Sequence, residues 1–127
     1  MANFKIITNN PMASAKYPEL AEFHDTSAEL VLIFCRDAVH KGAVLINHPL
    51  SGGIAPNQNP YKSLIVSLKN QQTDFMSVKL IENALEAINK TGIKKSAQYD
   101  SSILEDFQII DLDILDSAMN ALPPGFY

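Results

Sequence analysis

Short apolar runs alternate along the chain with segments whose apolar residues recur at helical spacing. The short runs predict strands over Phe4–Thr8, Ala21–His24, Ala43–Asn47, Tyr61–Leu68 and Phe107–Asp111. The longer segments predict helices from Thr26 to Lys41, from Asp74 to Lys90 and from Leu112 to Leu122. This order predicts a single α/β domain over residues 1–127. We expect a small layered sandwich, with a mixed, mostly parallel sheet of about 4–5 strands flanked by helices.

The ends of these segments carry recognisable capping residues. Thr26 and Glu29 form a capping-box pattern, which predicts Thr26 as the N-cap of its helix. The apolar run Ala43–Asn47 has no polar residue before Asn47, which is typical of a central strand covered on both faces. No helix is predicted between this run and Tyr61–Leu68. We therefore expect these two strands to be antiparallel neighbours, because a parallel crossover usually contains a helix.

Two irregular segments follow apolar strands and carry the residues most suited to binding. In open α/β sheets, ligands bind at the carboxyl ends of the strands. Ser51-Gly52-Gly53 can turn successive backbone N–H groups toward an anion, and His48 can act as an acid or base. The candidate ligand-binding residues are Asn9, Asn10, His48, Ser51, Gly52, Gly53, Lys62 and Ser63. This hypothesis requires both segments to open onto one pocket. The alternative is a loop that only crosses the end of the sheet.

Other functional motifs are missing or ambiguous in the sequence. There is no Walker A ending and no spaced third glycine of a dinucleotide fingerprint, so no cofactor is predicted. His24 and His40 are isolated, which argues against a metal site. Cys35 lies in an apolar helical run and is interpreted as a buried hydrophobe. We interpret one acidic cluster as a solvated helix N-terminus rather than a cation site: Glu105, Asp106, Asp111, Asp113 and Asp116.

Composition narrows the classes of partner. The net charge of −4 and the lack of a basic stripe argue against nucleic-acid binding. No apolar run approaches the ~20 residues that span a bilayer, so no membrane partner is expected. The single cysteine and the lack of a signal-peptide pattern favour a cytoplasmic location.

Three blocks of sequence resemble the GrdX family. They are Ile6–Pro11, the stretch from His48 to Asn57 with Pro60–Ser63, and Leu104–Asp111. The family is named for genes that lie beside glycine reductase components in amino-acid-fermenting anaerobes. The resemblance implies an accessory role in glycine, sarcosine or betaine reductase metabolism. It transfers no reaction and no catalytic residues.

Three functions remain open at this point, and the sequence leaves undecided whether the protein is an enzyme. The first is an accessory protein that binds a small anionic metabolite. The second is an interaction protein, in which the apolar arc of residues 29–41 or the Phe126–Tyr127 tail contacts a reductase component or a second copy of the chain. The third is an enzyme with His48 as general acid or base, which requires a carboxylate partner that the sequence does not place.

Overall fold

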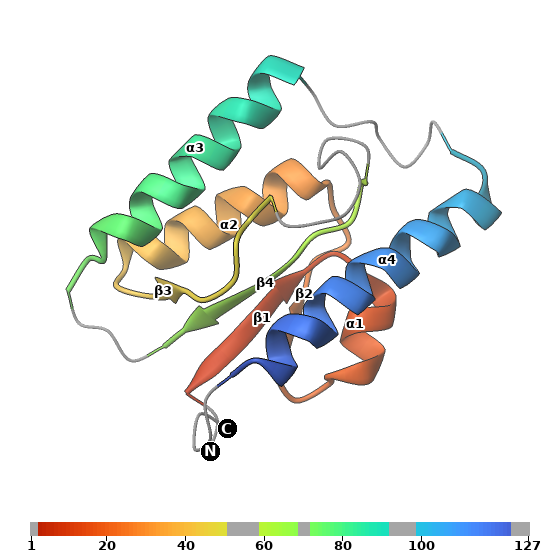
Figure 1. Ribbon diagram of the computed structural model, residues 1–127, viewed down its shortest axis with the longest axis horizontal. Helices are drawn as coiled ribbons and strands as arrows, with labels where there is room; N and C mark the ends of the chain where they lie inside the picture. The colour runs from red at the N-terminus through yellow and green to blue at the C-terminus, as the bar shows by residue number, and fades with distance from the viewer. Residues whose placement is uncertain (1–2, 51–58, 69–71, 92–98, 123–127) are drawn as a thin grey trace.

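The computed structural model describes residues 3–50, 59–68, 72–91 and 99–122 of the chain (Figure 1). In this part of the chain four strands form one open mixed sheet, and helices cover both of its faces. The strands are β1 (Phe4–Thr8), β2 (Ala21–Phe23), β3 (Val44–Leu45) and β4 (Ser63–Ser67). The helices are α1 (Pro11–Lys16), α2 (Ala28–His40), α3 (Phe75–Thr91) and α4 (Ser101–Asn120). The predicted α/β class is confirmed.

The sheet order is β2-β1-β4-β3. β1 pairs in parallel with β2, whereas β4 runs antiparallel to both of its neighbours, β1 and β3. The predicted antiparallel pairing of the strands on either side of the long loop is confirmed. The expectation of a mostly parallel sheet is wrong. β4 enters the sheet at the end where β1 and β3 leave it, so its direction opposes both.

The prediction that the run after α2 forms a central strand is also wrong, because β3 lies at the edge of the sheet. The Asn47 side chain ends the strand early: its Oδ1 accepts from the Ile65 N–H at 2.8 Å, and its Nδ2 donates to the Ser63 carbonyl at 3.2 Å. Leu45 packs in one layer of the core and Ile46 in the other. The run is therefore apolar on both faces even at an edge.

The predicted strand over Phe107–Asp111 is part of helix α4. The helix begins after Asp100, whose Oδ1 accepts from the Ile103 N–H at 3.0 Å. Two adjacent isoleucines favoured a strand locally, but the segment lies within a helix whose buried face packs on the sheet. Tertiary packing therefore overrides a weak local preference.

Other helix ends differ little from expectation. Ser27, not Thr26, caps α2, since its Oγ accepts from the Leu30 N–H at 3.2 Å. Asp74 caps α3 as predicted, with its Oδ2 accepting from the Ser77 N–H at 3.0 Å. Gly42 follows α2 with a φ of 107°, a conformation that glycine adopts readily.

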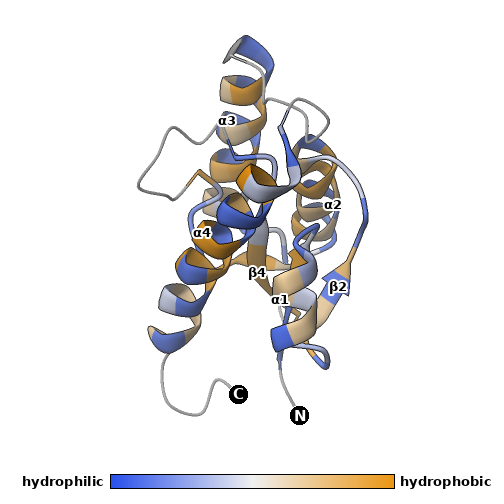
Figure 2. Ribbon diagram, turned by 90° about the vertical axis from the view of Figure 1, so that its right-hand side faces the viewer, coloured by the Kyte–Doolittle hydropathy of each residue, from blue (hydrophilic) through white to orange (hydrophobic). Residues whose placement is uncertain are grey.

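The core has two layers, one on each face of the sheet. The α2/α3 layer packs α2 and α3 on Ile7, Leu64 and Val66, and Cys35 lies within it, fully buried as predicted. The α1/α4 layer packs α1 and α4 on Phe4, Ile6, Ile65 and their neighbours. Figure 2 shows hydrophobic and hydrophilic residues alternating along the helices of both layers. Within the described residues, no helix has the length and apolar character needed to cross a bilayer.

Candidate functional site

The end of the sheet where β1 and β3 finish is also where β4 starts. Thr8 at the end of β1 pairs with Ser63 at the start of β4. Beyond β3, the Ile46 N–H still donates to the Ile65 carbonyl at 2.9 Å. Asn9–Asn10 and the segment after Leu45 therefore leave the sheet at the same end, as the binding hypothesis requires. Ser51, Gly52 and Gly53 lie outside the described residues.

Asn9 joins β1 to the segment before β4. Its Nδ2 donates to the Thr26 carbonyl at 2.8 Å and to the Pro60 carbonyl at 2.9 Å. Its Oδ1 accepts from the backbone N–H of Lys62 at 2.9 Å. The side chain is 5% exposed, so these three bonds satisfy an amide that has left water. The bond to Asn9 Oδ1 fixes the backbone position of Lys62.

Asn10 connects the same end of the sheet to α4. It is the N-cap of α1, with its Oδ1 accepting from the Met12 N–H at 3.0 Å. Its Nδ2 donates to the Gln108 carbonyl and to Oδ2 of Asp111, each at 2.9 Å. The Asn10 side chain therefore caps α1 and at the same time bonds two residues of α4. Asn10 therefore fixes where α4 lies over the sheet.

A chain of hydrogen bonds ends on the carboxylate of Asp111. The Asn10 N–H donates to Thr8 Oγ1 at 2.9 Å, and Ser63 Oγ donates to Asp111 Oδ2 at 2.6 Å. The two hydroxyls lie 2.7 Å apart. Because Ser63 gives its hydrogen to Asp111, Thr8 must be the donor to Ser63. All donors thus point toward Asp111, which is the arrangement that stabilises its charged form.

Lys62 and Asp111 are buried charged residues at this end of the sheet, each 6% exposed. Burial lowers the pKa of Lys62, and the negative charge of Asp111 partly opposes that change. Burial also raises the pKa of Asp111, against the bonds from Ser63 and Asn10 and the charge of Lys62. Both shifts have the same origin, because an interior of low polarity disfavours any charge. The neutral forms of this pair are therefore closer in energy than in water.

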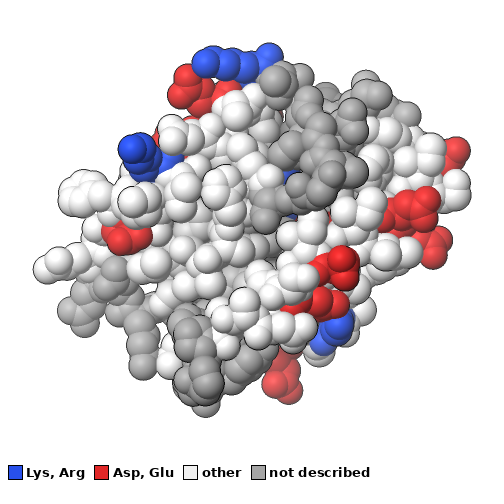
Figure 3. All heavy atoms as spheres, in the orientation of Figure 1, with Lys and Arg blue, Asp and Glu red and all other residues white. Residues whose placement is uncertain are grey.

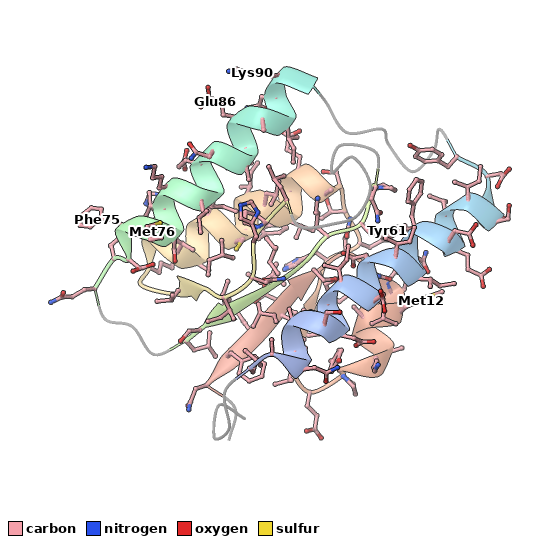
Figure 4. All side chains as sticks on the ribbon, in the orientation of Figure 1. Met12, Tyr61, Phe75, Met76, Glu86 and Lys90 are labelled. Carbon is pink, nitrogen blue, oxygen red and sulfur yellow. The ribbon has the colours of Figure 1, made fainter. Side chains whose placement is uncertain are left out.

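Residues before β4 fasten this end of the sheet to α4. Asn59 Nδ2 donates to the Phe107 carbonyl at 3.1 Å, and Asn59 Oδ1 accepts from the Tyr61 N–H at 2.9 Å. The Gln108 Nε2 donates to the Tyr61 hydroxyl at 2.9 Å. Figure 4 shows Tyr61 beside α4. We give the name Asp111 cluster to a set of buried polar and charged residues at this end of the sheet: Thr8, Asn10, Lys62, Ser63 and Asp111.

His48 is not part of the Asp111 cluster. It is exposed, and its Nδ1 accepts from the Leu50 N–H at 3.1 Å. Among the described residues, no carboxylate forms a hydrogen bond or ion pair with it. Hydrogen bonds of the described residues therefore connect Asn9 to Lys62 and join Asn10 and Ser63 through Asp111, whereas His48 shares none of these bonds.

Asp111 is the residue that sequence reasoning missed. It was assigned to a solvated acidic cluster, but it is buried and bonded to β4 and to the N-cap of α1. Asp111, Leu115 and Met119 recur every four residues and form the buried stripe of α4. An aspartate in register with a buried apolar stripe was the available signal. The local preference of residues 107–111 for a strand hides this register, because the stripe exists only when the segment is helical.

The remaining acidic residues of α4 differ from Asp111. Glu105, Asp106 and Asp113 are exposed, and Figure 3 shows acidic side chains over α4 on the outer surface. Asp116 bonds Lys16 at 2.7 Å and the Tyr17 hydroxyl at 2.5 Å, which ties α4 to α1. Within the described ranges, no group of three or more potential metal ligands comes together.

A family of GrdX-like proteins matches the chain over residues 5–120, a range that includes the whole Asp111 cluster. None of the curated proteins and none of the solved structures compared with the chain matches it. The chain therefore belongs to the GrdX-like family, and the resemblance seen in its sequence blocks is confirmed.

Proposed function

We propose that this member of the GrdX-like family binds a small anionic metabolite beside Lys62, as an accessory protein of glycine, sarcosine or betaine reductase metabolism. The metabolic part rests on the gene neighbourhood for which the family is named. The binding part rests on one observation: a lysine that is 6% exposed at the end of the sheet where β1, β3 and β4 meet.

The electrostatics of the Asp111 cluster favour an anion at Lys62. An ammonium group in a poorly hydrated place gains from each negative group that approaches it. Asp111 is the internal negative partner, but its Oδ2 also accepts from Ser63 and Asn10. A carboxylate or phosphate on the ligand supplies the second negative group. Its binding raises the lowered pKa of Lys62 back toward the ordinary value.

A thermal-shift series with acetate, inorganic phosphate and acetyl phosphate tests this proposal. We expect at least one of them to raise the melting temperature of the wild type, because a ligand of the folded state stabilises it by about 2.7 kcal/mol at a hundred times its Kd. Lys62→Met keeps the length of the side chain but removes the charge, and it abolishes the shift. Lys90→Met is the matched control, because Lys90 is exposed and pairs with Glu86 on the surface of α3. No shift with any of the three anions contradicts the proposal.

A second candidate function, contact with a reductase component, is favoured by an exposed apolar pair at the start of α3. Phe75 and Met76 are 83% and 64% exposed, and Figure 4 shows Phe75 projecting from the helix. The apolar arc of α2 is less exposed: Val31, Leu32, Cys35 and Val39 are buried, whereas Leu30 is 43% exposed. The Phe126–Tyr127 tail lies outside the described residues. Capture of a purified reductase component by the wild type, and its loss in Phe75→Ser/Met76→Ser, would favour this function.

A further inference from the structure

We propose that β2 is the interface of a symmetric dimer, in which the β2 strands of two copies of the chain pair antiparallel across a two-fold axis through Phe23. The pairing joins the two sheets into one continuous sheet. It uses the same surface on both copies, as a two-fold interface requires. The inference does not rest on the anion site proposed above.

The outer side of β2 offers backbone groups for this pairing. In a parallel pair, alternate residues of one strand bond the same neighbouring strand. The Leu20 carbonyl accepts a hydrogen bond from β1, and the His24 N–H donates one to β1, each at 2.9 Å. The N–H and carbonyl of Phe23 therefore point away from β1. Figure 2 shows β2 at the margin of the molecule, and no strand of the described residues lies beyond it.

The opposite edge of the sheet is closed by a side chain. β3 is the other outer strand, and its Leu45 N–H donates to the Ser77 Oγ of α3 at 2.9 Å. A bond that occupies an N–H at an edge prevents a further strand from using it. In the part of the chain that the structure describes, no side chain bonds the backbone of Phe23 in this way. A second copy can therefore extend the sheet at β2 but not at β3.

One register of the paired strands suits both the backbone and the charges. The Ala21 N–H already donates to the Tyr17 carbonyl at 2.9 Å, so Phe23 is the residue of β2 whose N–H and carbonyl can both bond a second copy. A two-fold axis through Phe23 places Glu22 of each copy opposite His24 of the other. An axis through Glu22 would instead place two glutamates opposite each other, and directly opposed like charges destabilise a pair of strands.

Side chains on both faces of β2 fit this register. Glu22 and His24 are 38% and 30% exposed, and the axis brings a second imidazole to each carboxylate. Phe23 is on the other face of the strand and is 41% exposed, and cross-strand pairs of aromatic residues stabilise a sheet. The His24 ring stacks on Phe34 of α2, with the ring centroids 4.2 Å apart. Leu30, 43% exposed, lies one turn before Phe34 and adds apolar surface beside the axis.

Two charge variants of the full chain test the register. Glu22→Lys/His24→Lys makes both positions positive and His24→Glu makes both negative, so each variant opposes like charges in its own dimer. Mixing the two variants opposes a lysine to a glutamate in both pairs. By analytical ultracentrifugation we expect a wild-type dimer, roughly tenfold weaker dimerisation of each variant alone, and a heterodimer in the mixture. Mixing cannot repair a defect within one chain, so this rescue assigns the contact to the interface.

Three results of that experiment overturn the proposal. The first is a wild type that stays monomeric at every concentration. The second is a pair of variants that each dimerise as strongly as the wild type. The third is a mixture that remains monomeric although circular dichroism shows both variants folded.

A disulfide across the axis tests the position of the interface. Residues that face each other in a hydrogen-bonded antiparallel pair have Cα atoms about 5.5 Å apart, which a disulfide can bridge. Phe23→Cys should therefore give a covalent dimer on oxidation by copper phenanthroline, whereas the native Cys35 is buried. Phe75→Cys is the matched control, because Phe75 is 83% exposed but lies at the start of α3. Cross-linking through Phe75→Cys that equals or exceeds that through Phe23→Cys overturns the interface at β2.

Discussion

The two faces of the sheet are held together in different ways. In the α2/α3 layer the buried contacts are almost all apolar, and the buried Ser77 lies at its edge, donating to Asp74 and accepting from the Leu45 N–H. In the α1/α4 layer an apolar half, with Leu115 and Met119, adjoins the Asp111 cluster. Apolar burial stabilises the α2/α3 layer but does not select one orientation of its helices, since the hydrophobic effect has no direction. In the α1/α4 layer, the hydrogen bonds of the Asp111 cluster do select one orientation, because they fix how α4 is rotated about its axis and where it lies over the sheet.

Removal of the Asp111 carboxyl should give the largest effect on this comparison. Asp111→Ala leaves Lys62 buried without its negative partner and leaves donors on Ser63 and Asn10 unused. We expect a loss of about 3–5 kcal/mol in the free energy of unfolding, as for other broken buried pairs. Urea denaturation followed by circular dichroism measures it. A loss below about 1 kcal/mol would show that the cluster does not hold α4, because that is the size of an exposed pair.

An apolar truncation in the opposite layer provides the matching case. Leu32 is fully buried in the α2/α3 layer, and Leu32→Ala should lower the free energy of unfolding by about 3 kcal/mol through lost burial and a cavity. Hydrogen exchange should then show faster opening of α2 and α3, with α4 less affected. Uniform acceleration across all helices would contradict the separation of the two layers.

A single hydroxyl tests the direction of the hydrogen-bond chain. Thr8→Val keeps the shape of the side chain but leaves the Asn10 N–H and the Ser63 hydroxyl each without one partner. We expect a loss of about 1–3 kcal/mol, the usual result of an unsatisfied buried group. Ser117→Ala, at an exposed position of α4, is the control and should change stability little. If the two variants are equally stable, the hydrogen bonds of Thr8 make no net contribution to the free energy of unfolding.

Dependence of stability on pH gives the smallest expected effect. The folded pKa of Asp111 is raised above its ordinary value, so the folded state binds its proton more readily than the unfolded state. As pH falls from neutral toward the ordinary aspartate range, this residue therefore adds stability. We expect the difference in unfolding free energy between wild type and Asp111→Asn to shift in favour of the wild type as pH falls. A difference that moves the opposite way would place the folded pKa below its ordinary value.

The contrast also explains which parts of the fold could be predicted. Apolar periodicity located β1, α2 and α3, because the α2/α3 layer is built from the residues that periodicity detects. It could not assign Phe107–Asp111, whose β-branched residues favour a strand while its long-range bonds require a helix. Asn10 and Ser63 were predicted as ligand contacts, yet their side chains bond Asp111, which is far away in sequence. In the sequence, a polar residue at a strand end that binds a ligand cannot be distinguished from one that bonds a distant side chain of the same protein.

The sole thiol of the chain has a practical consequence. Burial raises the pKa of Cys35 to about 12, so the folded protein presents essentially no thiolate near neutrality. Alkylating reagents at neutral pH should modify Cys35 only when α2 separates from the sheet. The rate of that modification therefore measures how often the α2/α3 layer opens, and the measurement requires no label or substitution.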